Sequence, residues 1–378
     1  MTALRVLFWG SAGLIAWTHV GYPVAAAAAA RLRRYAPRRD EGFLPELAFI
    51  VAAHDEEAVL QERLENALRL DYPRERLEIV VASDGSRDGT RTVVESFAGE
   101  GVRLIDLPRV GKVSAQNEAV KATNGDVIAF SDANSLWEPD ALRVLVRNLA
   151  DPEVGYVCGR LQLEDAGNGD NREGLYWDFE LWLREQESAC GSITAGNGGI
   201  YAVRRSAFLE LEPEHGHDLG FPFRLRRRGL RSVYEPEAVA REQALTTTRA
   251  EWGRKVRMLS RAWAEVLRGG MLDPRGQPPF YFAALFSHRL VRYASGVLHL
   301  TLFGASVALA PRDRAARSLL ALQLGSLGLA LAGRRRSELP VAGAAWYYAV
   351  VTGASVAGLA RALTRGADVT WMPTRTES

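Results

Sequence analysis

Four aspartates in the first 220 residues stand where chemistry is expected. Asp55, Asp84 and Asp132 directly follow short apolar runs, and Asp218 lies in a polar loop that begins at His215. Carboxylates of this kind can hold a divalent metal, bind a ribose hydroxyl or remove a proton from a substrate. A single aspartate after a strand is more often a helix cap or a turn former. Three of them in one half of a sheet indicate a binding site.

The elements that must position these aspartates are short strands separated by helices. The apolar runs Leu47–Ala53, Leu77–Ala82 and Val127–Ser131 alternate with helix-sized segments. This alternation is typical of a parallel sheet, and side chains at the carboxyl ends of its strands face the ligand-binding crevice. Further strands are expected at Val102–Leu107 and Val154–Gly159. The predicted fold class is therefore α/β, a Rossmann-like, doubly wound and mainly parallel sheet within residues 41–270.

The first strand-to-helix turn lacks both a G-x-G-x-x-G motif and a P-loop, so a bound nucleotide needs another way to neutralise its phosphates. A divalent metal is the usual solution. Asp132-Ala133-Asn134 follows a strand, and residues two apart on a strand point the same way, which brings two oxygen donors together. The sequence predicts Mg²⁺ or Mn²⁺ bound by Asp132 and Asn134.

A long apolar segment near the amino terminus predicts a membrane anchor. Val6–Ala30 contains no Asp, Glu, Lys or Arg and is long enough to cross a bilayer core of about 30 Å. A signal peptide is the alternative, but the run is long and a cluster of arginines from Arg31 to Arg39 follows it. By the positive-inside rule we expect residues 1–40 to be an anchor with a basic segment and the next domain to be cytoplasmic. The arginines could also contact anionic lipid headgroups.

A second apolar block forms the carboxyl-terminal part. Ala294–Ala310, Leu319–Gly333 and Val341–Leu363 are candidate spans, with buried globular helices as the alternative. Residues 271–293 mix aromatic and basic side chains and predict a helix in the membrane interface. The expected organisation is an integral protein of a bacterial-type inner or plasma membrane, with spans within 294–365 and a tail at 366–378. The number of spans and the side of the tail stay open.

Composition excludes few partners. The formal net charge of +2 over 378 residues gives no electrostatic case for a nucleic-acid partner. Cys158 and Cys190 have no metal-ligand spacing and are expected to be reduced, as in a cytosolic domain. The sequence does not indicate an oligomeric state.

Several short motifs follow one another in a recognisable order. They are Ala53-His54-Asp55-Glu56, residues 82–90, residues 111–117, Asp132-Ala133-Asn134, residues 196–205, residues 233–238 and Arg254-Lys255-Val256-Arg257. The ordered set, from Phe49 to about Trp263, resembles family 2 of the inverting glycosyltransferases, the GT-A-fold group that includes cellulose, chitin and hyaluronan synthases. The apolar segments on both sides are similar to those of its membrane-bound polysaccharide synthases.

The resemblance implies roles for the residues of a donor site. Asp55 and Asp84 match the positions that hold the uracil and ribose of a UDP-sugar, and Lys112 matches a basic residue of the donor site. Asp132 matches the first acid of the D-x-D motif, which bridges donor and metal. Asn134 departs from the second acid of that motif, and its neutral amide oxygen is a poorer metal ligand.

The resemblance also implies a catalytic base. Asp218 takes the place of the general base, with the N-cap of a helix at Leu219–Arg228 as the alternative role. Arg254 and Arg257 match the start of the Q-x-x-R-W-like segment and would neutralise the leaving diphosphate. Met258 stands where that segment has Trp, which puts long-chain processivity in doubt.

Asn197 and Tyr201 are candidates for the acceptor side of the site. The expected function is that of a membrane-bound inverting glycosyltransferase that transfers sugar from a UDP-sugar to a glycan or a lipid-linked acceptor. A polyprenyl-phosphate sugar transferase is the first alternative. The second is a non-catalytic GT-A domain that acts as a membrane scaffold.

Overall fold

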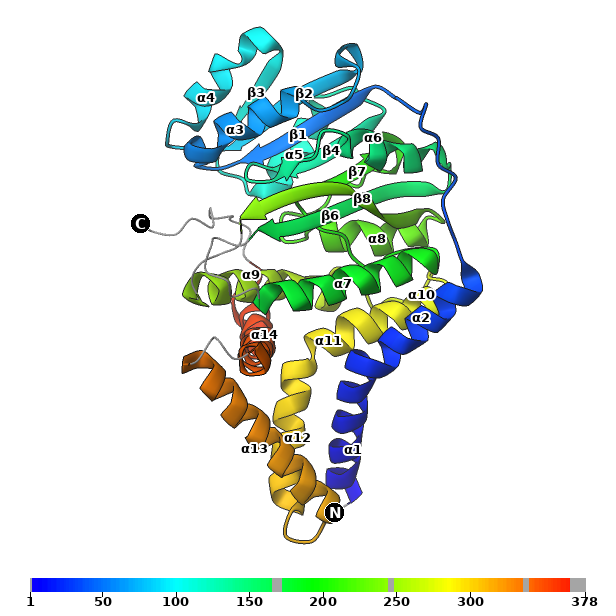
Figure 1. The fold of residues 1–378 in the computed structure, drawn as a ribbon, viewed down its shortest axis with the longest axis vertical. Coiled ribbons are helices and arrows are strands. Elements are labelled where there is room, and N and C mark those ends of the chain that lie inside the picture. Colours follow the sequence, from blue (N-terminus) through cyan, green and yellow to red (C-terminus); the bar gives the residue numbers. More distant parts are fainter. Residues whose placement is uncertain (1, 165–171, 244–247, 336–339, 368–378) are drawn as a thin grey trace.

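The structure, a computed structural model, describes residues 2–164, 172–243, 248–335 and 340–367. An α/β sandwich forms the upper part in Figure 1, and long helices extend away from it below. The predicted tail at 366–378 lies outside the described residues from 368 onward.

One mixed sheet of eight strands, in the order β3-β2-β1-β4-β7-β6-β8-β5, forms the centre of the sandwich. The half made of β3, β2, β1 and β4 is parallel, as predicted. The other half is not, because β7 enters antiparallel to both β4 and β6, while β8 runs parallel to β6. The strands are β1 (Leu47–Ala53), β2 (Leu77–Asp84), β3 (Val102–Leu107), β4 (Val127–Asp132), β5 (Leu136–Trp137), β6 (Val154–Glu164), β7 (Ile200–Arg204) and β8 (Arg231–Gln243).

Helices cover both faces of this sheet, which explains its uninterrupted apolar strands. All seven residues of β1 are buried, and alternate side chains enter two separate cores. Phe49 packs with α3 and α6, whereas Ile50 packs with α5, α7 and α8. The helices of the sandwich are α3 (Glu57–Leu68), α4 (Thr90–Ser96), α5 (Lys112–Lys121), α6 (Ala141–Val146), α7 (Arg172–Ala189) and α8 (His217–Arg227), with 3-10 turns at Arg74–Arg76, Ala98–Glu100, Arg147–Ala150 and Arg205–Ala207.

The strand ends carry the predicted aspartates. Asp84 is the last residue of β2, Asp132 is the last residue of β4, and Asp55 follows β1 by two residues. The predicted strands Leu47–Ala53 and Val102–Leu107 are confirmed to the residue.

The lower part consists of helices, and two π-helical segments join α1 to α2 and α10 to α11. Phe8 of α1 packs in one apolar cluster with residues of α12 and α13, and α7 and α9 lie between these helices and the sheet (Figure 1). The elements are α1 (Thr2–Ala16), η1 (Trp17–Gly21, π-helical), α2 (Tyr22–Arg33), α9 (Thr248–Leu267), α10 (Pro279–Ala284), η6 (Leu285–Leu290, π-helical), α11 (Val291–Tyr293), α12 (Ser295–Leu309), α13 (Arg314–Arg335) and α14 (Pro340–Thr364).

Among the described residues, one helix is long and apolar enough to cross a membrane by itself, the stretch Arg314–Arg334. The segments Pro279–Tyr293 and Ser295–Leu309 qualify only as a pair, and they meet at a bend of 63°. The predicted anchor Val6–Ala30 is helical but is interrupted by η1. The number of spans therefore stays a prediction.

Candidate functional site

Asp84 is a fully buried carboxylate with one oxygen in use. Its Oδ1 accepts the N–H groups of Val110 at 2.6 Å and of Gly111 at 2.9 Å. Gly111 has a φ of 93°, a conformation that favours glycine. The other oxygen, Oδ2, is buried and has no hydrogen-bond partner among the described residues. Since a buried acceptor without a partner is costly, Oδ2 is suited to a donor group of a ligand.

Asp55 is held in a strained backbone conformation beside Asp84. Its φ is 53°, in the left-handed region that aspartate tolerates better than most residues. Its Oδ1 accepts the N–H of Arg87 at 2.7 Å, and its Oδ2 lies 3.3 Å from Nε2 of His54. Nδ1 of His54 lies 2.6 Å from the carbonyl oxygen of Asp84. The imidazole therefore fixes the two strand ends relative to each other.

An ion pair lies at the next strand end. Lys112, the first residue of α5, bonds through Nζ to Oδ1 of Asp132. Both side chains keep some solvent exposure, 18% for Lys112 and 24% for Asp132. A β-carbon on Gly198 would lie 3.6 Å from Nζ of Lys112 and 3.9 Å from Oδ2 of Asp132. The glycine turn at residues 196–199 thus forms one wall of the space beside this ion pair.

Glu242 adds a second carboxylate near Asp132, and sequence reasoning missed it. It lies at the end of β8, where its carboxylate accepts a hydrogen bond from the hydroxyl of Ser135. Burial and the charge of Asp132 raise the pKa of Glu242 to about 7, although Lys112 and Arg254 oppose the shift. No local pattern in the sequence marks Glu242, because its position depends on how β8 pairs with β6.

These residues fit a hard divalent cation. Asp132 and Glu242 supply carboxylate oxygens, and burial together with the charge of Asp132 disfavours ionised Glu242, which a bound cation would favour. Asn134 is exposed in the turn after β4 and stays a predicted ligand. Among the described residues no group of three His, Cys, Asp or Glu is placed to hold a metal. The remaining ligands would have to come from a phosphate or from water, as is common for Mg²⁺.

Asp218 lies next to the glycine turn at residues 196–199. It is in the first turn of α8, whose N-cap is Gly216 without a side-chain cap bond, so the N-cap role for Asp218 is wrong. Its carbonyl oxygen accepts the N–H of Gly196 at 2.7 Å. Burial raises the pKa of its carboxyl group, although Lys112 and Arg261 oppose the shift. A carboxylate of raised basicity is suited to accept a proton.

The two predicted acceptor residues are buried. The amide of Asn197 donates to the carbonyl of Gly159 at 2.6 Å, and its oxygen accepts the N–H of Ile200 at 3.0 Å. The hydroxyl of Tyr201 lies 2.8 Å from Nδ1 of His217. Burial and the charge of Lys112 lower the pKa of His217 to about 3, so this imidazole is neutral. Contact of Asn197 or Tyr201 with an acceptor stays a prediction.

Three arginines lie along one face of α9, at positions i, i+3 and i+7. Arg254 is close enough to Glu242 to lower its pKa, and Arg261 has the same effect on Asp218. Arg257 lies between them on this face. The structure therefore adds Arg261 to the predicted pair, and the continued spacing of basic residues in the sequence was the available signal.

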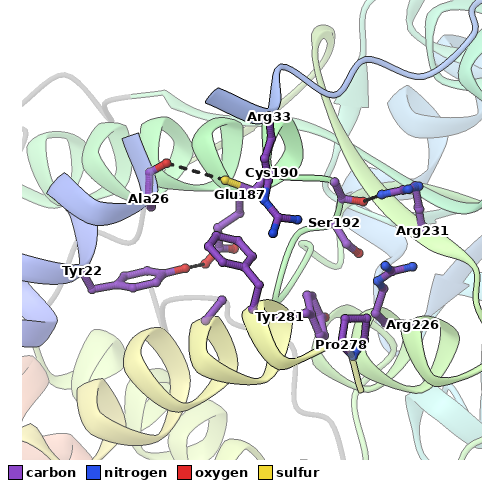
Figure 2. A pocket seen from close by; sticks show the side chains of 13 residues that line it. Tyr22, Ala26, Arg33, Glu187, Cys190, Ser192, Arg226, Arg231, Pro278 and Tyr281 are labelled. Atoms are coloured by element: carbon purple, nitrogen blue, oxygen red, sulfur yellow. Dashed lines mark hydrogen bonds between the residues drawn. The ribbon is translucent and has the colours of Figure 1, made fainter. Parts of the chain in front are cut away.

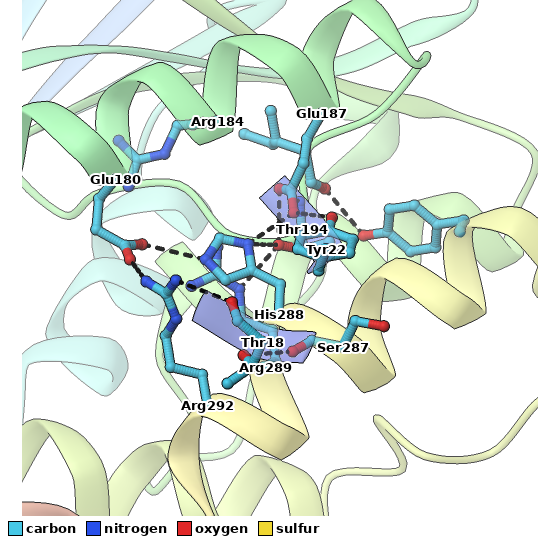
Figure 3. Close-up of polar contacts among 12 residues, drawn as sticks. Thr18, Tyr22, Glu180, Arg184, Glu187, Thr194, Ser287, His288, Arg289 and Arg292 are labelled. Atoms are coloured by element: carbon cyan, nitrogen blue, oxygen red, sulfur yellow. Dashed lines mark hydrogen bonds and ion pairs between the residues drawn. The ribbon is translucent and has the colours of Figure 1, made fainter. Parts of the chain in front are cut away.

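Two other acids, Glu180 and Glu187, belong to a buried network between α7 and η6 (Figure 3). Nδ1 of His288 lies 2.7 Å from Glu187 and its Nε2 lies 3.2 Å from Glu180. Glu180 also pairs with Arg292, and Glu187 accepts the N–H and the hydroxyl of Thr194. These carboxylates connect the sandwich to the lower helices, and their oxygens are engaged in hydrogen bonds and ion pairs there.

Residues 48–211 match the family described as glycosyl transferase family 2. A curated relative, beta-monoglucosyldiacylglycerol synthase from Nostoc sp., is 30% identical over 277 residues, which cover 70% of this chain and 58% of that protein. Poly-beta-1,6-N-acetyl-D-glucosamine synthase from Staphylococcus aureus is 24% identical over 228 residues, 58% of this chain and 54% of that protein. The chain thus spans little more than half the length of these relatives.

A solved structure extends the likeness to nearly the whole chain. It is the mannosyltransferase PcManGT from Pyrobaculum calidifontis, in complex with GDP-Man and Mn²⁺. The two folds align with a TM-score of 0.73 at 24% identity, over 95% of this chain and 99% of that one. The likeness therefore includes the lower helices as well as the GT-A-like sandwich.

Proposed function

The chain carries a glycosyltransferase domain of family 2, and we propose that it transfers a sugar from a UDP-sugar to a lipid acceptor at a membrane surface. One observation carries this proposal: Lys112 acts on both sides of the site. It pairs with Asp132, and its charge opposes the rise in pKa of both Glu242 and Asp218. A donor held at Asp132 would therefore have its sugar within reach of Asp218.

The proposed base of the donor is uracil. Asp84 has one oxygen saturated by two backbone N–H groups and one oxygen without a partner. Uracil presents a single imino N–H, which matches one free acceptor. Guanine presents an imino N–H beside an amino group, and a carboxylate binds that pair best with both oxygens. The oxygen count at Asp84 therefore favours UDP over GDP.

The diphosphate would lie at the amino terminus of α5, against Lys112 and Arg254. Unsatisfied N–H groups and the helix dipole favour an anion at that position. Asp132 and Glu242 would hold Mg²⁺ or Mn²⁺, which supplies positive charge for the diphosphate when it is bound. The Mn²⁺ named with PcManGT supports a metal in this fold.

Asp218 is the proposed general base. An inverting transfer is a direct displacement at the anomeric carbon, and it requires one group to take the proton of the acceptor hydroxyl. Burial gives Asp218 a raised pKa, so the carboxylate is a stronger base than an exposed aspartate. Arg261 beside it would orient the carboxylate while it is ionised.

The proposed acceptor is a lipid with a free hydroxyl, such as diacylglycerol. The name of the Nostoc relative supports this class of acceptor, and so do large exposed apolar side chains along α12 and α13, including Leu300, Leu322 and Leu331. Attachment to a membrane is part of the proposal. A growing glycan is the second candidate, because the Staphylococcus relative is named as a polysaccharide synthase. A polyprenyl phosphate is a further lipid acceptor that the same test includes.

The test is a donor and acceptor screen with the purified full chain in neutral-lipid nanodiscs. UDP-glucose, UDP-galactose, UDP-N-acetylglucosamine and GDP-mannose would each be offered with diacylglycerol, a polyprenyl phosphate or an oligosaccharide. We expect UDP release and a glycolipid of matching mass. Turnover only with GDP-mannose would contradict the assignment of the base, and products only from the oligosaccharide would contradict the lipid acceptor.

A further inference from the structure

A pocket of about 100 Å³ lies outside the proposed catalytic site, where the sandwich meets the lower helices. Its walls come from α2, the end of α7, the end of α8, the start of β8 and α10 (Figure 2). In Figure 2 the side chains of Arg33, Arg226 and Arg231 point toward one space. Apolar side chains, among them Ala26, Phe280 and Ala284, complete the wall.

The positive charge of this pocket is only partly compensated. Arg231 pairs with Glu153 at 2.9 Å and donates to the carbonyl of Gly191 at 3.1 Å. Among the described residues, no carboxylate lies within ion-pairing distance of Arg33 or of Arg226. Burial and the neighbouring charge of Arg231 lower the pKa of Arg226. The hydrogen bond of Arg226 to its own chain, to the carbonyl of Gly229, is long at 3.5 Å.

Glu187 also lines the pocket but does not neutralise it. Its oxygens accept hydrogen bonds from the hydroxyl of Tyr22 at 2.6 Å and from Thr194, and one of them contacts His288. Burial alone would raise the pKa of Glu187, but His288, Arg289 and Tyr22 together lower it to about 2. The carboxylate is therefore ionised, and its single negative charge offsets only part of the positive charge of the three arginines.

Arg226 and Arg33 each make one contact that stabilises the fold. Arg226 lies in the last turn of α8, where a cation complements the helix dipole. The guanidinium of Arg33 lies 4.2 Å from the ring centre of Phe280. Neither contact uses the fork of N–H donors that a guanidinium offers, and a phosphate group matches that fork in charge and shape.

We propose that this pocket binds the phosphate of an anionic phospholipid headgroup. The inference rests on the proposed attachment to a membrane, because α2 and α10 are where the long apolar helices join the sandwich. The pocket is separate from the donor site: α8 has Asp218 at its start and Arg226 at its end, about 12 Å apart at the rise of an α-helix.

The test is native mass spectrometry of the delipidated full chain in a neutral detergent. The protein would be titrated with dioleoyl phosphatidylglycerol, with dioleoyl phosphatidylcholine and with inorganic phosphate. We expect phosphatidylglycerol to bind about tenfold more tightly than phosphatidylcholine, because both lipids carry a phosphate but the arginines of the pocket repel the choline cation. Arg226→Gln and Arg33→Gln should each remove most of this preference. Arg91→Gln, at an exposed arginine on α4, is the matched control and should leave it intact.

Each outcome decides the proposal. Equal binding of the two lipids would overturn it, and so would a preference that survives in Arg226→Gln and Arg33→Gln. Binding of inorganic phosphate as tight as that of phosphatidylglycerol would overturn the lipid as the source of the phosphate. UDP affinity, measured on every variant, shows that the sandwich is folded. A lipid preference without any sugar transfer would support the lipid site and refute the proposed function. Sugar transfer without a lipid preference would support the proposed function and refute the lipid site.

Discussion

Two groups of acidic side chains lie on either side of the loop at residues 191–199, and they differ in how fully they are satisfied. On the sheet side, Oδ2 of Asp84 has no partner, and the pKa of Glu242 is raised to about 7. On the other side, Glu187 receives hydrogen bonds from several groups and its pKa is lowered to about 2. A buried carboxylate surrounded by partners therefore holds structure, whereas one left short of partners is available to a ligand.

The largest expected effect is on turnover. Asp218→Asn should lower kcat by about 10²–10⁴, because the amide cannot accept the proton of the acceptor. UDP affinity should stay nearly unchanged, since the carboxyl group is not a donor-binding group in this account. Stability should change little, because Asp218 is not the N-cap of α8. Steady-state kinetics beside UDP titration is the measurement, and a variant that keeps more than a tenth of wild-type turnover would show that the base is elsewhere.

The next effect is on stability, on the other side of the loop. Glu187→Gln removes the negative charge that faces Arg289 and that accepts hydrogen bonds from Tyr22 and Thr194, and removing one partner of a buried charge pair costs about 3–5 kcal/mol. We expect a lower melting temperature with unchanged UDP affinity. The pKa of Glu187 is lower in the folded than in the unfolded protein. Its contribution to the free energy of unfolding is therefore present above about pH 4.5 and is lost as the pH falls toward 2. An unchanged melting temperature at pH 7 would contradict the structural role of Glu187.

A smaller effect is expected on nucleotide affinity. Asp84→Asn keeps an oxygen for Val110 and Gly111 but turns an amide N–H₂ toward the bound base, where uracil also presents a donor. UDP should bind about 10–100-fold more weakly, the usual cost of an unsatisfied polar group facing a ligand. Glu78→Gln, on the same strand but exposed at its surface, is the control. Affinities that stay equal for the Asp84 variant and this control would remove Asp84 from the donor site.

The smallest effect is a change in pH dependence. The pKa of Glu242 is higher in the folded than in the unfolded protein. Its contribution to the free energy of unfolding is therefore lost as the pH rises from about 4.5 through about 7. Glu242→Gln should therefore raise the melting temperature at pH 8 relative to wild type, with little difference at pH 4. A variant less stable than wild type at pH 8 would mean that the ionised carboxylate of Glu242 has enough partners to stabilise the fold, as that of Glu187 has.

Much of the sheet side could be predicted from the sequence. Strands buried on both faces are uninterrupted apolar runs, so β1 and β3 have clear limits, and the aspartates that end such runs have to lie at one edge of a parallel sheet. Asp55, Asp84 and Asp132 therefore came together as expected. The antiparallel insertion of β7 depends on pairing with β4 and β6, which no local pattern encodes.

The remaining residues could not be predicted because their neighbours are distant in sequence. Glu242 stands between the polar residues Arg241 and Gln243, so its role depends on how β8 pairs with β6. Glu187 and His288 are 101 positions apart. The contact of Trp17 with Ser287, 2.9 Å between Nε1 and Oγ, joins two π-helical segments that interrupt otherwise ordinary apolar helices.

In the proposed function, the donor diphosphate lies at Asp132 and Glu242 together with a divalent cation. Isothermal titration of UDP into the purified full chain, once with Mn²⁺ and once with EDTA, tests it most directly. We expect Mn²⁺ to tighten UDP binding to the wild-type protein and Asp132→Ala to remove the difference. Equal UDP affinity in Mn²⁺ and EDTA, with Asp132→Ala binding like wild type, would contradict it.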